Sequence, residues 1–263
     1  MAKQDNQQQV IVSLTSFPAA IDYAYKAVKS LLAGSVLPDK VVLYLTFEQF
    51  GNEGIPQKLT ELAHNNSIFE IRDYPREIRS YRKLVPALAD FPDAVIITVD
   101  DDVAYSPHLV RDMLELHNQF PEYILANRAK RIEPDRPYRK WHKFRWYNFL
   151  FKRFYPGYDI LQTGVGGVLY PPHSLKAEMI DEKLFTKYAP TADDIWFWAA
   201  ATANGTKLMP VPFGKNKPKG LGKPKSLSLK YVNFKSGSNR NSDAFHKIIN
   251  DFPEIKERLY NEK

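Results

Sequence analysis

Three consecutive aspartates, Asp100, Asp101 and Asp102, follow a run of apolar and β-branched residues, Val95–Val99. Adjacent carboxylates repel one another, so a cation is needed to offset their charge. Mg²⁺ and Mn²⁺ are suitable because they prefer oxygen ligands, and in an extended or turning segment the first and third side chains point the same way. The cluster therefore predicts a divalent metal site, although an exposed acidic turn before a helix starting at Ser106 would give the same pattern.

A second acidic pair, Asp193 and Asp194, precedes the apolar run IWFWAAA. Thr191 and Asp194 have the spacing of a capping box, so the pair could do no more than begin a helix. A carboxylate at the start of a helix can also act as a general base, which takes a proton from a reacting hydroxyl group. Successive helical residues diverge by about 100°, so at most one of the two carboxylates faces a substrate. The pattern leaves both interpretations open.

Both acidic clusters need a scaffold, and the chain around them predicts alternating strands and helices. The expected strands cover residues 10–18, 40–46, 67–74 and 95–99, and the expected helices cover residues 21–33, 56–64 and 80–90, the last with Ser80 as its N-cap. Apolar strands that alternate with helices indicate an α/β, Rossmann-like fold with a mostly parallel sheet flanked by helices. Ligands of such sheets bind beyond the carboxyl ends of the strands, which is where the three aspartates fall. The second half is less regular, with Pro-rich and Lys-rich loops.

The composition narrows the class of protein. The chain has 263 residues, 44% of them hydrophobic, which is enough for one large domain or two closely packed subdomains. It contains no cysteine, which excludes disulfides and thiolate metal sites. The net charge of +7 is unevenly distributed, because residues 195–242 hold nine Lys or Arg, residues 138–158 hold six, and neither segment holds an acid. These two basic patches favour anionic partners.

The N-terminal residues 1–9 are polar, and we expect them to be flexible. They lack the apolar region of a signal peptide, and no apolar run approaches the roughly 18–20 residues of a membrane span. These observations predict a cytoplasmic protein.

The ordered set of motifs resembles that of the GT-A glycosyltransferases, which use nucleotide-sugar donors. VIITVDDD is similar to their strand followed by Asp-x-Asp, and SLTSFP resembles the first-strand loop that holds the nucleoside base. SYRKLVPAL resembles the helix that carries a basic residue before the metal strand. TGVGGVLYPP resembles the glycine-rich segment beside the sugar and acceptor, and TADDIWFW resembles the acidic pair that supplies the base in inverting members. The resemblance spans residues 10–200 and is closest to bacterial capsule and lipopolysaccharide-type transferases.

This resemblance implies a Mn²⁺ or Mg²⁺ cofactor and a set of ligands for it. Asp102 would bind the metal, Asp100 would contact the metal through water or the donor ribose, and Asp101 could serve in either register. His246, in NSDAFH, is the candidate for a late histidine ligand by its position. A surface histidine on a helix would look the same.

The resemblance also implies donor-binding and catalytic residues. Expected donor contacts come from Thr15, Ser16, Lys83, Arg79, Arg82, Gly166 and Gly167. A solvated helix lysine and a tight glycine turn are the structural alternatives for Lys83 and the glycines. In the family the second member of the acidic pair is the base, so the expected base is Asp194, with Asp193 as the second choice.

Ten of the 21 residues in segment 138–158 are aromatic, and they alternate with basic residues. On a helical wheel Trp146 and Phe151 fall on one face and Lys152 on the other, which is the pattern of an interfacial helix on an anionic membrane. A helix packed on the protein core has the same pattern. The lysine-rich loop 214–225 could close over a diphosphate or touch lipid phosphates. None of the standard RNA-binding motifs appears, so we expect no nucleic-acid partner.

The expected function is metal-dependent transfer of a sugar from a nucleoside-diphosphate donor to a hydroxyl acceptor, with inversion, in surface polysaccharide or glycolipid assembly. Residues 10–130 would bind the nucleotide sugar, and residues 131–263 would bind the acceptor, for which a lipid-linked saccharide at the inner face of the membrane is one candidate. Two alternatives stay open. A nucleotidyltransferase would need an early glycine- and arginine-rich loop, which SLTSFPAAID lacks. A non-catalytic membrane- or nucleic-acid-binding module would leave the aspartates unexplained.

Overall fold

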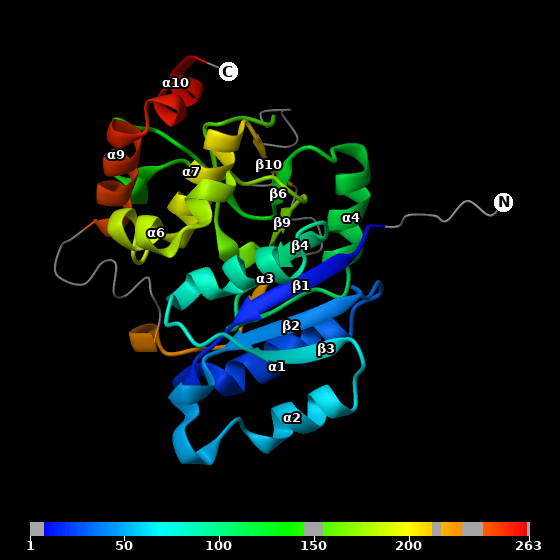
Figure 1. Cartoon of the computed structure of the whole chain (residues 1–263). Helices are drawn as coiled ribbons and strands as arrows, with labels where there is room; N and C mark the ends of the chain where they lie inside the picture. Colours follow the sequence, from blue (N-terminus) through cyan, green and yellow to red (C-terminus); the bar gives the residue numbers. More distant parts are fainter. Residues whose placement is uncertain (1–7, 145–154, 212–216, 228–238, 262–263) are drawn as a thin grey trace.

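The computed structural model describes residues 8–144, 155–211, 217–227 and 239–261, and its centre is a seven-stranded sheet between helices (Figure 1). In sheet order the strands are β10 (Leu208–Pro210), β6 (Ile124–Ala126), β9 (Val168–Tyr170), β4 (Val95–Thr98), β1 (Val10–Thr15), β2 (Lys40–Leu45) and β3 (Phe69–Asp73). All neighbours are parallel except that β9 runs antiparallel to both β4 and β6. The mostly parallel α/β sheet predicted from the sequence is confirmed.

The described helices follow the strands along the chain. The α-helices are α1 (Ile21–Leu32), α2 (Gln57–His64), α3 (Val85–Asp90), α4 (Leu109–Gln119), α6 (Glu182–Tyr188), α7 (Asp193–Asn204), α9 (Arg240–Asp251) and α10 (Pro253–Asn261). Short 3₁₀ helices are η1 (Pro18–Ala20), η2 (Phe47–Glu53), η3 (Arg79–Lys83), η4 (Tyr138–Lys140), η5 (Gly164–Gly166), η6 (Ala177–Ile180) and η7 (Lys225–Leu227).

The sheet is buried on both faces because successive side chains of a strand point to opposite sides. Ile11 and Ile96 pack into a hydrophobic cluster that includes residues of α3, α6, α7, α9 and α10. Their neighbours Val12 and Ile97 pack into a second cluster with residues of α1, α2 and α4. This arrangement explains why the strands read as continuous apolar runs, and it leaves the carboxyl ends of the strands as the place for polar chemistry.

The helix expected over residues 80–90 is broken at Leu84 into η3 and α3. Pro86 lies in the first turn of α3, and its missing N–H and its ring prevent a continuous helix from passing through this point. The prediction of Ser80 as an N-cap is wrong, because Ser80 lies inside η3 and its buried hydroxyl has no hydrogen-bond partner among the described residues. Because of the break, η3 is separate from α3, and it contacts β1 and β2.

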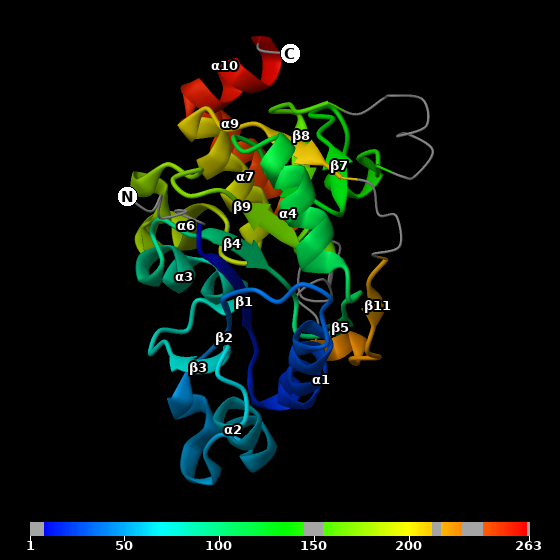
Figure 2. The ribbon, with the colours of Figure 1, turned by 90° about the vertical axis from the view of Figure 1, so that its right-hand side faces the viewer.

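Two short antiparallel ladders lie beside the main sheet. One pairs β7 (Ala129–Arg131) with β8 (Ile160–Gln162), and the other pairs β5 (Val103–Ala104) with β11 (Lys219–Gly220). Figure 2 shows β11 alongside β5, so part of the lysine-rich segment returns to the chain directly after the three aspartates. Strands from both halves of the chain form the main sheet, and the division of roles near residue 130 stays a prediction.

The described aromatic residues of segment 138–158 belong to the core, except Tyr155, which is 45% exposed. Tyr138, Trp141 and Phe144 are buried, and the ring of Trp141 meets that of Phe245 edge to face, with centroids 5.0 Å apart. Residues 138–144 contain η4 and an isolated bridge but no α-helix, so the interfacial helix does not include them. Trp146 and Phe151 lie outside the described residues. Within the described ranges, no helix is both long and apolar enough to cross a membrane.

Candidate active site

The three aspartates lie at the carboxyl end of β4, where the sequence predicted a site. The strand ends at Thr98, and the chain turns at Asp101 and Asp102 before β5 begins. The side chains of Asp100 and Asp102, expected to act together, have different cationic partners. Asp100 pairs with Lys83, whereas Asp101 and Asp102 both pair with Lys223. Two cations therefore divide the cluster.

Lys83 connects the two acidic motifs of the sequence. Its Nζ lies 3.2 Å from Oδ1 of Asp100 and 3.1 Å from Oδ2 of Asp193. The side chain of Lys83 is 8% exposed, and its backbone carbonyl accepts a hydrogen bond from the Ser13 hydroxyl in β1. Burial alone would lower the pKa of Lys83, but Asp100, Asp193 and Asp194 outweigh it and raise that pKa well above its usual value. Lys83 is therefore a fixed positive charge between the carboxylates.

Asp194, in the first turn of α7, is placed by the turn that follows β8. Its Oδ1 accepts a hydrogen bond of 3.1 Å from the backbone N–H of Gly164, and its carbonyl accepts one of 3.0 Å from the Gln162 amide. The capping box predicted Thr191 as the N-cap of α7, but the N-cap is Ala192, which makes no side-chain cap hydrogen bond. Burial and the charge of Asp193 raise the pKa of Asp194 to about 7, although Lys83 opposes the shift.

Gly164 lies directly against this cluster. A β-carbon at this position would come within 2.6 Å of the Lys83 Nζ, 3.2 Å of Oδ1 of Asp100 and 3.5 Å of Oδ1 of Asp194. Real β-carbons do not approach other heavy atoms as closely as the first of these distances, so a side chain here would force Lys83 to move. Glycine at 164 lets the backbone N–H reach the Asp194 carboxylate while the lysine stays in place.

Asp101 and Asp102 form the second half of the site. Oδ1 of Asp101 and Oδ2 of Asp102 lie 2.7 and 2.9 Å from the Nζ of Lys223, and the Ser16 hydroxyl donates to Oδ2 of Asp101 at 2.6 Å. Two carboxylates that converge on one ammonium group provide hard oxygen ligands, so the pair fits a divalent cation in place of that group. The described residues contain no group of three or more His, Asp or Glu side chains around a metal position, so water and a substrate would have to complete the ligand set.

The expected nucleotide-binding residues lie at the carboxyl ends of β1 and β2. The Thr15 hydroxyl donates to the carbonyl of Tyr44 and accepts from Nε of Arg82, at 2.9 and 2.8 Å. Arg82 also donates to the Ser16 carbonyl at 2.9 Å and to the Thr46 hydroxyl, and its side chain is 2% exposed. Arg82 thus links two strand ends from inside the protein, which is a positioning role.

The remaining predicted residues lie apart from this centre. A β-carbon on Gly166 would come within 2.9 Å of the Arg128 β-carbon, and one on Gly167 would come within 3.3 Å of Leu109. Arg79 is exposed and has a left-handed backbone with a φ of 53°. His246 is exposed on α9, and it forms no metal-binding group with the aspartates among the residues that the structure describes. Their contacts with a donor or metal stay predictions.

Sequence patterns did not identify two residues of this site. Gly164 stands in the glycine-rich motif, but the pattern does not tell which of its glycines meets the carboxylates. Lys223 stands in an acid-free lysine run, and the charge imbalance of that run was the available signal. Its partner Asp101 is 122 residues away, so no local pattern singles out this lysine among its neighbours.

Comparisons with known proteins concern the fold of the chain. No protein-family model matches the sequence, and no curated protein sequence matches it. The structure is similar to that of S. aureus TarS residues 1–349, with 13% identity and a TM-score of 0.55 over 97% of this chain and 75% of that one. It is also similar to the mannosyltransferase PcManGT from Pyrobaculum calidifontis in complex with GDP-Man and Mn²⁺, with 12% identity and a TM-score of 0.51 over 79% of this chain and 56% of that one. At these identities the similarity concerns the fold, and the chain has a glycosyltransferase fold.

Proposed function

We propose that this protein is a metal-dependent glycosyltransferase that moves a sugar from a nucleoside-diphosphate donor to a hydroxyl acceptor, with inversion at the anomeric carbon. The cluster around Lys83 carries the proposal. One buried cation joins the aspartate that follows β4 to the acidic pair of α7, and a carboxyl group of raised pKa lies beside them. Perturbed carboxyl groups at the carboxyl ends of sheet strands are typical of catalytic sites.

The donor diphosphate would bind beyond β4. Asp101 and Asp102 would hold Mn²⁺ or Mg²⁺, and the diphosphate and water would complete its ligands. When bound, the metal would neutralise negative charge on the departing nucleoside diphosphate. Lys83 would contribute a second positive charge, and the strand-end loop at Thr15 and Ser16 would contact the base or ribose. PcManGT, whose fold is similar, binds GDP-Man and Mn²⁺, which supports a nucleotide-sugar donor here.

Asp194 would be the general base. Its pKa of about 7 lies close to neutral pH. At this pH a large fraction of the carboxyl group is deprotonated, and its affinity for a proton is still high enough for it to act as a base. It would take the proton of the acceptor hydroxyl while that oxygen bonds to the anomeric carbon and the bond from this carbon to the diphosphate oxygen breaks. Attack opposite the leaving group inverts the anomeric centre. The proton would stay on Asp194 until product leaves.

The acceptor class that we propose is a saccharide hydroxyl in surface polysaccharide or glycolipid assembly, with a lipid-linked saccharide as the leading candidate. The motif set, which resembles bacterial capsule and lipopolysaccharide-type transferases, and the two basic segments support this choice. The enzyme would work in the cytoplasm at the inner face of the membrane.

A panel of UDP-, GDP-, ADP- and dTDP-sugars tests the proposal through slow donor hydrolysis, with release of free sugar measured in Mn²⁺ and in EDTA. We expect one nucleotide class to be hydrolysed, and only with the metal. A nucleotidyltransferase would instead release pyrophosphate from a sugar phosphate and a nucleoside triphosphate. No hydrolysis and no binding of any nucleoside diphosphate would contradict the proposal.

A further inference from the structure

Lys223 forms ion pairs with the two carboxylates that the proposed function assigns to the metal. Its Nζ lies 2.7 Å from Asp101 and 2.9 Å from Asp102, and its side chain is 10% exposed. The side chain of Asp101 is 9% exposed, so this carboxylate is largely withdrawn from water. A buried carboxylate needs a positive partner, and here the protein supplies its own.

Backbone contacts hold the lysine at this place. The N–H of Leu221 donates to the carbonyl of Asp102 at 2.8 Å, and Lys219 pairs with Ala104 across the β5–β11 ladder. Figure 2 shows this ladder next to α1, on the side of the molecule where β4 ends. Lys223 therefore reaches the carboxylates from a segment that is hydrogen-bonded to the backbone of Asp102.

An ammonium group and a divalent cation cannot share these oxygens, because they would lie within contact distance and repel each other. Metal binding to Asp101 and Asp102 must therefore displace Lys223. The displaced ammonium group would need another anion, and a diphosphate at the same metal is an anion of the right kind and place.

We propose that Lys223 is an internal counter-ion. It occupies the carboxylates of Asp101 and Asp102 and excludes divalent cations until a donor diphosphate is present. On donor binding the ammonium group moves from the carboxylates to phosphate oxygens, and the metal takes its place. This inference rests on the proposed function and adds to it a coupling between metal and donor. Metal alone binds weakly, and metal with nucleotide binds tightly.

The loss of Mn²⁺ affinity depends on the fraction of molecules in which Lys223 is paired with Asp101 and Asp102. If Lys223 is paired with the two carboxylates in about nine molecules of ten, the apparent affinity for Mn²⁺ falls about tenfold. Lys223→Met removes the charge and keeps most of the side-chain volume. Lys219→Met is the matched control, since Lys219 is an exposed lysine of the same segment and its contact with β5 is through the backbone.

The test measures Mn²⁺ affinity of the full chain without nucleotide, by electron paramagnetic resonance of free Mn²⁺. We expect Lys223→Met to bind Mn²⁺ at least about tenfold more tightly than the wild type, and Lys219→Met to match the wild type. UDP or GDP should tighten Mn²⁺ binding by a larger factor in the wild type than in Lys223→Met, because the variant has no counter-ion to displace.

A second measurement covers the case in which Lys223→Met folds poorly. The variant leaves two carboxylates without a cation, so its melting temperature should fall without metal and recover in Mn²⁺ by more than that of the wild type, as expected for a ligand of the folded state.

Two results would overturn the inference in different ways. Equal Mn²⁺ affinity of Lys223→Met and wild type, in proteins that take up Mn²⁺ with nucleotide, would exclude the counter-ion and leave the proposed function intact. If neither protein took up Mn²⁺ with or without nucleotide, the counter-ion role and the metal-dependent function would both be wrong.

Discussion

Asp193 and Asp194 are adjacent residues, but they have different partners. Asp193 is buried and lies 3.1 Å from the ammonium group of Lys83, whereas Asp194 accepts a hydrogen bond from the Gly164 backbone. Burial and then the negative charge of Asp193 raise the pKa of Asp194, which favours proton acceptance near neutral pH. In this account Asp193 is a positioning residue and Asp194 is the base.

This relation predicts how transfer depends on pH. A base must be deprotonated to act, so the wild-type rate should rise as the pH increases through about 7. Asp193→Asn removes a charge that raises the pKa of Asp194, so the rising limb should move to lower pH while transfer at high pH is largely retained. Rates across the pH range for both proteins are the measurement. Loss of transfer at every pH in Asp193→Asn would mean that Asp193, and not Asp194, is the base.

Gly164 gives a second prediction at the level of one residue. Gly164→Ala should displace the Lys83 ammonium group, since the new β-carbon would lie 2.6 Å from it, and transfer should fall at least tenfold, which is about 1.4 kcal/mol of activation free energy. Gly220→Ala is the control, because its β-carbon would meet no atom within 4 Å. Donor hydrolysis rates and melting temperatures compare the two. Equal activity in both variants would mean that Lys83 tolerates displacement.

At the level of elements, η3 connects the strand ends to the cluster of carboxylates around Lys83. Arg82 ties β1 to the residue after β2 from inside the protein, and Lys83, the next residue, faces Asp100 and Asp193. The break at Leu84 makes this possible, because a continuous helix to Asp90 would fix the orientation of both side chains relative to α3. The proline that interrupts the helix therefore helps to place the site.

Arg82 and Arg79 should consequently respond differently to substitution. Arg82→Leu leaves the Ser16 carbonyl and the Thr15 and Thr46 hydroxyls without their buried donor, and we expect it to lower the free energy of unfolding by about 2–4 kcal/mol. Arg79→Leu changes an exposed side chain, so the loss should stay within about 0.5 kcal/mol. Urea denaturation of both variants is the measurement. Equal losses of unfolding free energy in the two variants would mean that Arg82 does not have this structural role.

The same elements show what the sequence can and cannot predict. Apolar strands of the first half and the acidic residues after β4 follow from local patterns, because burial and the strand period leave a local signature. The division of Asp100 from Asp102 does not, since it depends on their separate ion pairs with Lys83 and Lys223. The Lys223 contact depends on a segment returning over 122 residues to Asp101, and Pro86 changes a helix whose apolar pattern is continuous.

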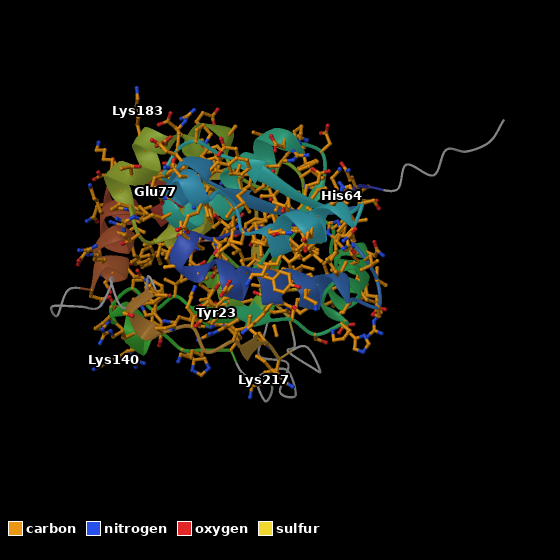
Figure 3. All side chains as sticks on the ribbon, turned by 90° about the horizontal axis from the view of Figure 1, so that it is seen from below. Tyr23, His64, Glu77, Lys140, Lys183 and Lys217 are labelled. Carbon is orange, nitrogen blue, oxygen red and sulfur yellow. The ribbon has the colours of Figure 1, made fainter. Side chains whose placement is uncertain are left out.

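At the scale of the whole molecule, two lysines of the basic segments lie toward one side, and Lys183 projects on the opposite side. Lys140 and Lys217 project along the same edge in Figure 3, and both are exposed. In segment 138–144 the aromatic residues Tyr138, Trp141 and Phe144 are buried, while Lys140 and Lys143 are exposed. Residues 138–144 therefore contribute charge to the surface and aromatic rings to the core, and their contact with a membrane would be electrostatic.

We expect the protein to bind vesicles of an anionic lipid at low salt and to release them as salt rises. Each Lys or Arg near an anionic surface contributes about 1 kcal/mol, and screening removes this contribution. Co-sedimentation with anionic and with neutral vesicles is the measurement, and Lys140→Glu with Lys143→Glu should weaken it without a change in melting temperature. If the wild type ignores anionic vesicles at low salt, the basic segments serve the donor or a soluble acceptor.

The most direct test of the central claim is Asp194→Asn, measured with the nucleotide sugar that the donor panel identifies. The variant keeps the shape of the side chain and loses its ability to accept a proton. We predict unchanged donor affinity by calorimetry in Mn²⁺ and a loss of transfer of roughly 10²–10⁴-fold, as is typical when a general base is removed. Near-normal transfer by Asp194→Asn would contradict the account, because the carboxyl group beside Lys83 would then have no part in the reaction.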